Sequence, residues 1–98
     1  MKKTITVEEL KQILAQKEPV HLLDVRTPAE HQQFNIGGQL IPIQELALRL
    51  HEIHTDTRIV VYCRSGNRSQ TAVDLLEDAG IENAQNLIGG MMAWQNSI

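Results

Sequence analysis

The sequence predicts an α/β fold, with a small, open, mostly parallel sheet and helices on both faces. Strand-like apolar runs alternate with helix-like segments through short connections, an order that is typical of parallel sheets. Residues 59–62 are all apolar or aromatic, as expected of a buried central strand. The chain has 98 residues without repeats or linker-like tracts, so we expect a single domain over residues 1–98.

The first half of the chain contains two helix-start signals. Thr6-Val7-Glu8-Glu9 has the form of a capping box, and apolar residues at helical spacing follow it until Pro19. Residues 20–25 are largely apolar and predict the first strand of the sheet. Thr27-Pro28-Ala29-Glu30 then predicts a second, short helix, which Gly37-Gly38 ends.

The second half continues the alternation. After Pro42, apolar residues at positions 46, 50 and 53 predict a helical stripe to about His54. The later elements are expected at residues 58–62 (central strand), 69–79 (a helix closed by Gly80), 83–88 (a weak last strand) and near residues 93 and 94 (a short helix). Trp94 is expected to be a packing anchor.

Composition excludes several functions. A formal charge of −3 argues against nucleic acid or an anionic membrane as the main partner, and only three aromatic residues leave an aliphatic core. Met1-Lys2-Lys3 is not followed by an apolar segment, so we expect neither secretion nor a membrane span. One cysteine excludes an internal disulfide framework, and its reactive thiol suits a reducing compartment, so we expect a cytoplasmic protein.

Cys63 is the residue that points most clearly to chemistry. It ends the apolar run and begins a polar loop, which leads into a helical pattern, so loop N–H groups converge where a thiolate would lie. Three arginines and no carboxylate lie within residues 57–73, and we therefore expect a lowered thiol pKa. The alternative is a small buried hydrophobic residue, which predicts apolar neighbours that this loop lacks.

The loop supplies the other candidate site residues. We predict that Cys63 is the nucleophile and that the following residues bind an anionic substrate: Arg64, Ser65, Gly66, Asn67, Arg68 and Ser69. Gly66 lies where a tight loop needs positive φ or close backbone approach. Two alternatives stay open. Arg68 can instead tie the helix start to neighbouring carboxylates, and Arg64 can be a solvated charge at the rim.

Four stretches of the sequence resemble the rhodanese family of sulfurtransferases, which carry sulfur as a cysteine persulfide. They are Cys63-x-x-Gly66-x-Arg68-Ser69 (the family's active-site loop), residues 21–30 (a strand followed by its D-V-R-x-x-x-E signature), residues 38–42 (its glycine-to-proline segment) and residues 87–94 (its L-x-G-G-x-x-x-W ending). The stretches follow the family's order and span nearly the whole chain. One segment departs: Asn35 stands at the usual histidine, with one residue fewer before Pro42.

The resemblance implies the same α/β architecture and a defined reaction. The Cys63 thiolate would attack the outer sulfur of thiosulfate or of a low-molecular-weight persulfide and become a persulfide. A thiol, cyanide or a protein acceptor would then take the sulfur. We expect no metal ion and no other cofactor. The departure at Asn35 lies away from the cysteine loop and concerns any partner or substrate contact that this segment makes.

Two other functional classes remain as alternatives. Phosphatases and arsenate reductases also use a cysteine in a loop that ends in arginine, but their loop is C-x5-R, whereas Cys63 to Arg68 is C-x4-R. The shorter loop makes a smaller cradle, which suits a sulfur atom. The second alternative is a non-enzymatic sulfur carrier or interaction module with the same fold, which could have lost Cys63 or Arg68; both are present.

The remaining polar residues are expected to be structural. Asp24 and Arg26 alternate on one strand and can pair with neighbouring strand ends or cap loops. His51 and His54 share a helix face at metal-compatible spacing, but no third ligand is near them in the sequence, so we expect a solvated helix end. His21 and His31 have no assignable partner.

Overall fold

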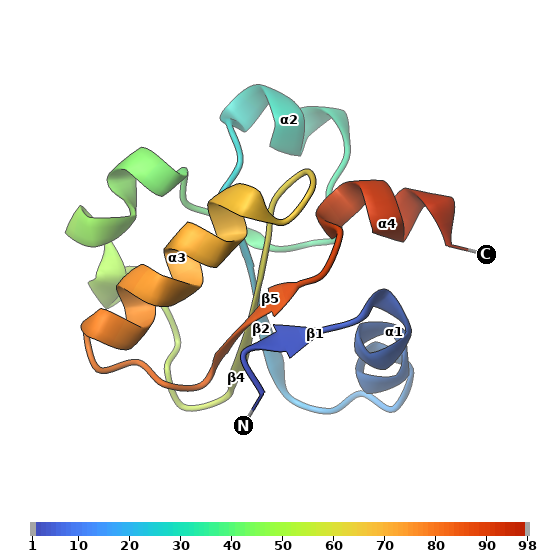
Figure 1. Ribbon diagram of the computed structural model, residues 1–98, viewed down its shortest axis with the longest axis horizontal. Coiled ribbons are helices and arrows are strands. Elements are labelled where there is room, and N and C mark those ends of the chain that lie inside the picture. Colours follow the sequence, from blue (N-terminus) through green and yellow to red (C-terminus); the bar gives the residue numbers. More distant parts are fainter. Residues whose placement is uncertain (1, 98) are drawn as a thin grey trace.

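The computed structural model describes residues 2–97 and shows an open five-stranded sheet (Figure 1). The strands are β1 (Thr4–Ile5), β2 (Val20–Asp24), β3 (Gln39–Leu40), β4 (Arg58–Tyr62) and β5 (Ala84–Leu87). The helices are α1 (Val7–Ala15), α2 (Pro28–Gln33), α3 (Asn67–Asp78) and α4 (Gly90–Asn96), with two 3-10 helices, η1 (Ile43–Leu48) and η2 (Leu50–Glu52). The strand order is β1-β5-β4-β2-β3 and every pair is parallel, which confirms the predicted α/β class.

Helices cover both faces of the sheet, as predicted. On one face, Leu46 of η1 and Leu76 of α3 are buried in one apolar cluster. On the other face, Leu10 of α1 and Met91 of α4 are buried in a second cluster. Figure 1 shows α3 to one side of the sheet, α1 and α4 to the other, and α2 at the carboxyl end of the strands. Within residues 2–97 no helix has both the length and the apolar surface to cross a membrane.

β4 is the central strand that the sequence predicts. Its residues 59–62 are fully buried, and they alternate between the two apolar clusters as a strand's side chains must. Ile59 and Val61 belong to the cluster under α3, and Val60 and Tyr62 to the cluster under α1. Tyr62 is the one aromatic side chain fully buried within residues 2–97, so the core is aliphatic, as expected.

Both predicted capping boxes are present. The Thr6 hydroxyl accepts from the Glu9 backbone N–H (3.1 Å), and the Glu9 carboxylate accepts from the Thr6 N–H (2.9 Å). Thr27 and Glu30 make the same reciprocal pair at the start of α2, which has Pro28 at its first position. These local signals fix where the two helices begin. α2 contains no buried residue, so its position depends on polar contacts described below.

Other elements differ from the sequence prediction. The apolar stripe at positions 46, 50 and 53 forms two 3-10 helices instead of one α-helix, because the backbone of Arg49 (φ −123°) interrupts the helix between them. α3 begins two residues earlier than expected. The strands β1 and β3 are too short to show alternation and were not predicted. The last strand was expected to be weak, yet all four residues of β5 are buried between β1 and β4.

Candidate active site

The loop that carries Cys63 lies at the carboxyl end of the central strand. β4 ends at Tyr62 and α3 begins at Asn67, so four residues make the connection. Ligands of parallel α/β sheets bind at this end of the strands. Gly66 precedes α3 with φ 109°, a left-handed conformation that side chains rarely tolerate, which is the reason for glycine that the sequence indicates. This turn directs the N–H groups of the loop back toward Cys63.

The sulfur atom of Cys63 receives several hydrogen bonds. The backbone N–H groups of Gly66 and Ser69 donate to Sγ at 3.1 Å and 3.4 Å, and the Ser69 hydroxyl lies 3.2 Å from it. Cys63 is buried, and burial by itself raises the pKa of its thiol. The bonds from the Ser69 hydroxyl and from the N–H groups of Ser69, Gly66 and Ser65 outweigh burial, so the pKa of Cys63 is held below its ordinary value.

The direction of this pKa shift confirms the sequence prediction, but its main cause differs. We expected the arginines to stabilise the thiolate together with the N–H groups. The hydrogen bonds of the loop have the larger effect on the thiol pKa. Because these N–H dipoles are fixed by the backbone, the loop itself prepares the site for a negative sulfur.

Asn86 fixes the Ser69 hydroxyl, and the sequence did not identify it. The Ser69 hydroxyl donates to Asn86 Oδ1 at 2.5 Å, while Asn86 Nδ2 donates to the Gly66 carbonyl (3.1 Å) and to Gln70 (3.2 Å). Asn86 thus ties β5 to both ends of the loop turn. The sequence feature that could have indicated this role is the pair of polar residues, 85 and 86, inside a strand that is otherwise apolar.

The single proton of the Ser69 hydroxyl limits what this chain of bonds can do. While that proton is directed at Asn86, the Ser69 oxygen can accept from the Cys63 thiol. When Cys63 ionises, the same hydroxyl can turn to the thiolate, and Asn86 Oδ1 then loses its donor. The thiol and thiolate forms of Cys63 therefore correspond to two arrangements of one buried network.

Arg68 is held by a carboxylate. Its two terminal nitrogens donate to the two oxygens of Glu30 at 2.7 Å and 2.9 Å, a bidentate pair between α3 and α2. The pair holds the pKa of Glu30 at about 2, chiefly through the hydrogen bonds from Arg68. Glu30 lies outside the carboxylate-free window of residues 57–73, and only the fold brings it to the loop. Arg68 therefore ties the start of α3 to a carboxylate, which is the structural alternative to substrate binding.

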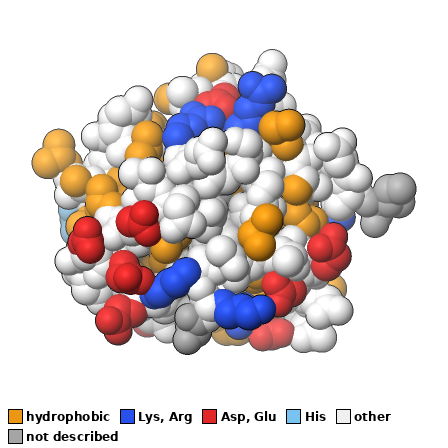
Figure 2. All heavy atoms as spheres, in the orientation of Figure 1, with side chains coloured by type: hydrophobic (Ala, Val, Ile, Leu, Met, Phe, Trp, Pro, Cys, Tyr) orange, Lys and Arg blue, Asp and Glu red, His pale blue; other side chains and the backbone are white. Residues whose placement is uncertain are grey.

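The other predicted residues of the loop contact solvent. Arg64, Ser65 and Asn67 are exposed, and within residues 2–97 Arg64 has no ion pair. Figure 2 shows positive side chains gathered at the end of the molecule where the loop after β4 lies in Figure 1. The structure thus brings the backbone of Ser65, Gly66 and Ser69 to the sulfur, pairs Arg68 with Glu30, and leaves the side chains of Arg64, Ser65 and Asn67 exposed.

The sequence of the chain matches a protein-family model. The model of the rhodanese-like domain matches residues 6–97. The chain belongs to the rhodanese-like domain family. This match covers the loop, every helix and every strand except β1.

Three members or relatives show how far the similarity extends. A protein named sulfurtransferase from Allochromatium vinosum is 44% identical over 91 residues, which cover 92% of this chain and 85% of that protein. An adenylyltransferase and sulfurtransferase of Arabidopsis thaliana is 34% identical over 96% of this chain, which spans only 24% of that longer protein. The structure of the human single-domain sulfurtransferase TSTD1 superposes with a TM-score of 0.85 at 25% identity and covers 100% of this chain and 99% of its own.

A buried polar cluster lies behind the loop of this rhodanese-like domain. Asp24 is fully buried and accepts from Arg26 Nε (2.9 Å) and Nη2 (2.7 Å), and it lies 2.8 Å from His31 Nδ1. Arg26 Nη2 also donates to the Phe34 carbonyl at 2.6 Å, which ties β2 to the end of α2. This contact agrees with the structural role expected of Asp24 and Arg26, and it gives His31 a partner that the sequence did not show.

His21, His54 and Trp94 make structural contacts. His21 Nε2 lies 2.8 Å from Gln39 Oε1, and its ring meets that of His54 edge to face. Within residues 2–97, no three histidine, cysteine or acidic side chains are grouped as metal ligands would be. Trp94 packs against the cluster under α1, with the Lys11 ammonium 5.1 Å from its ring centroid, so it has the anchoring position that we expected.

Proposed function

We propose that this chain is a sulfurtransferase that moves sulfane sulfur from an anionic donor to a thiophilic acceptor through a persulfide on Cys63. The observation that carries the proposal is the set of hydrogen bonds on the Cys63 sulfur, from two backbone N–H groups and beside the Ser69 hydroxyl. Such a site favours a thiolate and, next to it, a second negative sulfur. The names of the bacterial and human relatives support the same class of reaction.

The first half-reaction loads the cysteine. The Cys63 thiolate attacks the outer sulfur of thiosulfate, or of a low-molecular-weight persulfide, and forms a new S–S bond. The S–S bond of the donor breaks, and its electron pair leaves with sulfite or with a thiolate. No outside oxidant or reductant is needed, because one S–S bond replaces another.

The loop stabilises the loaded state. The outer sulfur of the persulfide carries the negative charge, and the N–H groups that converge on Cys63 are the nearest donors, with Ser65 and Asn67 at the rim. Exposed Arg64 attracts the anionic donor. Arg68 acts through Glu30, since their bidentate pair fixes the start of α3 against α2.

The second half-reaction releases the sulfur to a thiol, cyanide or a protein acceptor. The acceptor attacks the outer sulfur, and Cys63 leaves as a thiolate that the same hydrogen bonds stabilise. A lone thiol of lowered pKa stays reduced in a compartment such as the cytoplasm, which is where we propose that the protein works.

The geometry gives less support to phosphate chemistry. A phosphatase of the C-x5-R kind needs the arginine of its loop on the oxyanion, whereas the guanidinium of Arg68 is engaged by Glu30. The backbone N–H groups instead converge on a single sulfur atom.

The test is steady-state sulfur transfer from thiosulfate to cyanide, followed as thiocyanate. The parent protein should turn over, and Cys63→Ser should form no thiocyanate above the uncatalysed rate while it keeps the parent's circular dichroism spectrum. Thr55→Ala, which alters an exposed side chain outside the Cys63 loop, is the control and should keep the parent rate within about twofold. Parent-like turnover by Cys63→Ser would disprove the proposed mechanism.

A further inference from the structure

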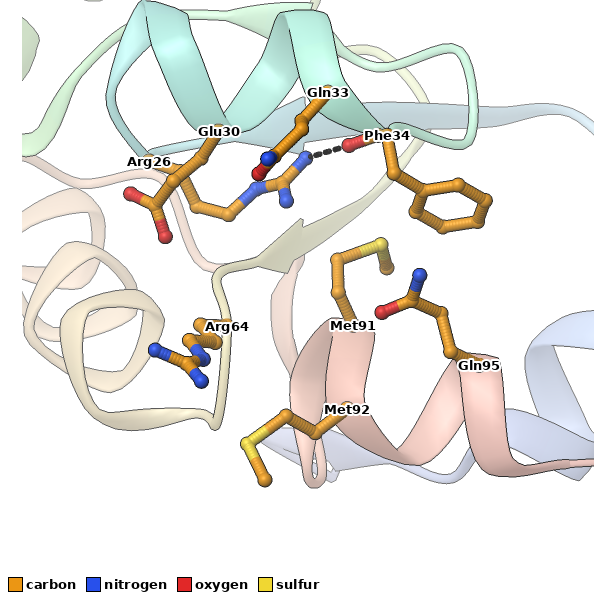
Figure 3. A pocket seen from close by; sticks show the side chains of 8 residues that line it. All are labelled: Arg26, Glu30, Gln33, Phe34, Arg64, Met91, Met92 and Gln95. Atoms are coloured by element: carbon orange, nitrogen blue, oxygen red, sulfur yellow. Dashed lines mark hydrogen bonds between the residues drawn. The ribbon is translucent and has the colours of Figure 1, made fainter.

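A hollow of about 430 Å³ lies beside the Cys63 loop (Figure 3). Its walls come from the end of α2, from Arg64 of the loop and from α4. The wall that α4 forms is tied to the nucleophile: the Met91 N–H donates to the Cys63 carbonyl and the Met92 N–H to the Arg64 carbonyl, both at 2.9 Å. The hollow is therefore adjacent to the active-site backbone, and its volume is in the range of pockets for small organic ligands.

Arg26 lies at the base of this hollow and is only partly satisfied. Its side chain is 5% exposed, and its Nε and Nη2 atoms are used by Asp24 and the Phe34 carbonyl. One face of the guanidinium is near the Tyr62 ring, at 5.5 Å. The remaining nitrogen, Nη1, makes no hydrogen bond within residues 2–97.

The Arg26 Nη1 atom is directed into the hollow. Figure 3 shows one nitrogen of the guanidinium bonded to Phe34 and another pointing toward Met91, into the space between α2 and α4. Among the described residues no side-chain nitrogen or oxygen is both fully buried and without a partner, so Nη1 is not fully buried, and Arg26 is one of the residues that line the hollow. A nearly buried guanidinium with two free N–H bonds is a strong site for a carboxylate.

The rest of the lining indicates what that carboxylate is attached to. Phe34, Met91 and Met92 supply apolar and thioether surface, and the amides of Gln33 and Gln95 lie at the rim. Asp24 balances Arg26 and Glu30 balances Arg68, which leaves the charge of Arg64 uncompensated by an ion pair within residues 2–97. The hollow thus suits a small molecule with an anionic end and an apolar part.

We propose that this hollow binds the acceptor thiol, a small organic thiol that carries a carboxylate, with the carboxylate on Arg26 Nη1 and the sulfur directed to Cys63. The inference rests on the proposed function. The thiolate of the ligand forms a bond to the outer sulfur of the Cys63 persulfide, the S–S bond to Cys63 breaks, and Cys63 leaves as a thiolate. The sulfur atom moves, the number of S–S bonds is unchanged, and the product is a persulfide of the small thiol.

Binding is tested without any sulfur transfer. The probes are 3-(methylthio)propionate and 3-(methylthio)propionamide, which share the apolar part and differ in charge, titrated by NMR into the parent protein. We expect the carboxylate to bind at least about fivefold more tightly than the amide. Arg26→Lys keeps a cation beside Asp24 but removes Nη1, and it should reduce the preference to less than about twofold. Arg49→Lys, an exposed arginine paired with Glu45 and Glu52, should keep it.

A second variant guards against a failure of Arg26→Lys to fold. Gln95→Trp adds bulk at the exposed rim without touching the ion pair, and it should weaken binding of both probes at least about fivefold. Equal affinity of the parent for the two probes, no binding of either, or a folded Arg26→Lys that keeps the preference would overturn the proposal.

A kinetic arm separates this proposal from the proposed function. The persulfide of the parent, preloaded with thiosulfate, is mixed with 3-mercaptopropionate or 3-mercaptopropionamide, and sulfur loss is followed by intact mass. The rate ratio should favour the carboxylate at least about fivefold and fall in Arg26→Lys. If the protein loads with sulfur but loses it at the same rate to both thiols, the proposed acceptor site alone is wrong. If Cys63 takes up no sulfur from thiosulfate, the proposed function is wrong, and the binding titration still decides whether the hollow selects a carboxylate.

Discussion

Replacing Ser69 by alanine tests how the loop stabilises the Cys63 thiolate. The hydroxyl of this fully buried residue lies 3.2 Å from the sulfur and donates to Asn86 at 2.5 Å. A hydrogen bond to a charged group contributes about 1.5–3 kcal/mol, against about 1 kcal/mol for the neutral bond to Asn86 that it replaces. The net gain of roughly 1.4 kcal/mol corresponds to about a tenfold change in the ionisation equilibrium. Below the pH at which the parent thiol ionises, Ser69→Ala should therefore hold about tenfold less thiolate.

The assay is the pH dependence of Cys63 alkylation by iodoacetamide. The parent should react as a thiol with a pKa below that of free cysteine, because hydrogen bonds from Ser69 and the loop N–H groups outweigh burial. In Ser69→Ala the profile should move to higher pH, and the two rates should converge where both thiols are ionised. Ser65→Ala, whose side chain is exposed, should follow the parent.

The same substitution has a cost in stability. It leaves Asn86 Oδ1 without its hydroxyl donor, and an unsatisfied buried acceptor costs about 1–3 kcal/mol of unfolding free energy. Urea denaturation measures this separately from the thiol titration. An alkylation profile of folded Ser69→Ala that overlies the parent's would refute the reasoning, since the hydroxyl would then contribute nothing to the thiolate.

Four further predictions follow from other contacts. Arg68→Ala should shift the alkylation profile less than Ser69→Ala does, because the guanidinium is engaged by Glu30; a larger shift in the same assay would contradict this. Glu30→Gln should cost about 1 kcal/mol at pH 7, allowing for the partial exposure of the ion pair. Because the pKa of Glu30 is lowered to about 2 in the folded state, this difference should disappear as pH falls from about 4.5 toward 2 in urea titrations. Gly90→Ala should destabilise by at least about 3 kcal/mol, since a Cβ there meets the Cys63 and Arg64 carbonyls. Gly80→Ala, which also has a positive φ but open space around its Cβ, should cost about 1 kcal/mol, and equal costs in thermal melts would count against this packing. Inserting glycine between Ser65 and Gly66 makes a C-x5-R loop and should reduce thiosulfate sulfur transfer at least about tenfold while arsenate binds more tightly; unchanged transfer in a folded variant would show that loop size does not set specificity.

Local signals in the sequence predicted much of the fold. Both capping boxes, the central strand at residues 58–62 and the glycine with positive φ at the start of α3 depend on neighbours within a few residues, so the sequence shows them directly. The two-residue strands β1 and β3 could not be predicted, because they become strands only by pairing with β5 and β2. The paired 3-10 helices were missed because 3-10 and α-helical stripes have similar spacing.

The candidate site divides in the same way. Cys63 and the loop after it could be predicted, since a strand, a polar loop and a helix start are contiguous in the sequence. The residues that complete the site come from elsewhere: Asn86 from β5 and Glu30 from α2. The sequence shows no partner for His31 for the same reason, because its contact with Asp24 requires α2 to fold back over β2. Contacts of this kind depend on how the elements pack, which no local pattern encodes.

The most direct test of the central claim is the intact mass of the protein, measured without reductant after thiosulfate and again after cyanide. Cys63 is the only thiol, so the claim allows one site of attachment. We predict a gain of one sulfur atom after thiosulfate, its complete removal by cyanide, and no gain in Cys63→Ser. A parent protein that gains no sulfur, or a Cys63→Ser variant that gains it equally, would contradict the account.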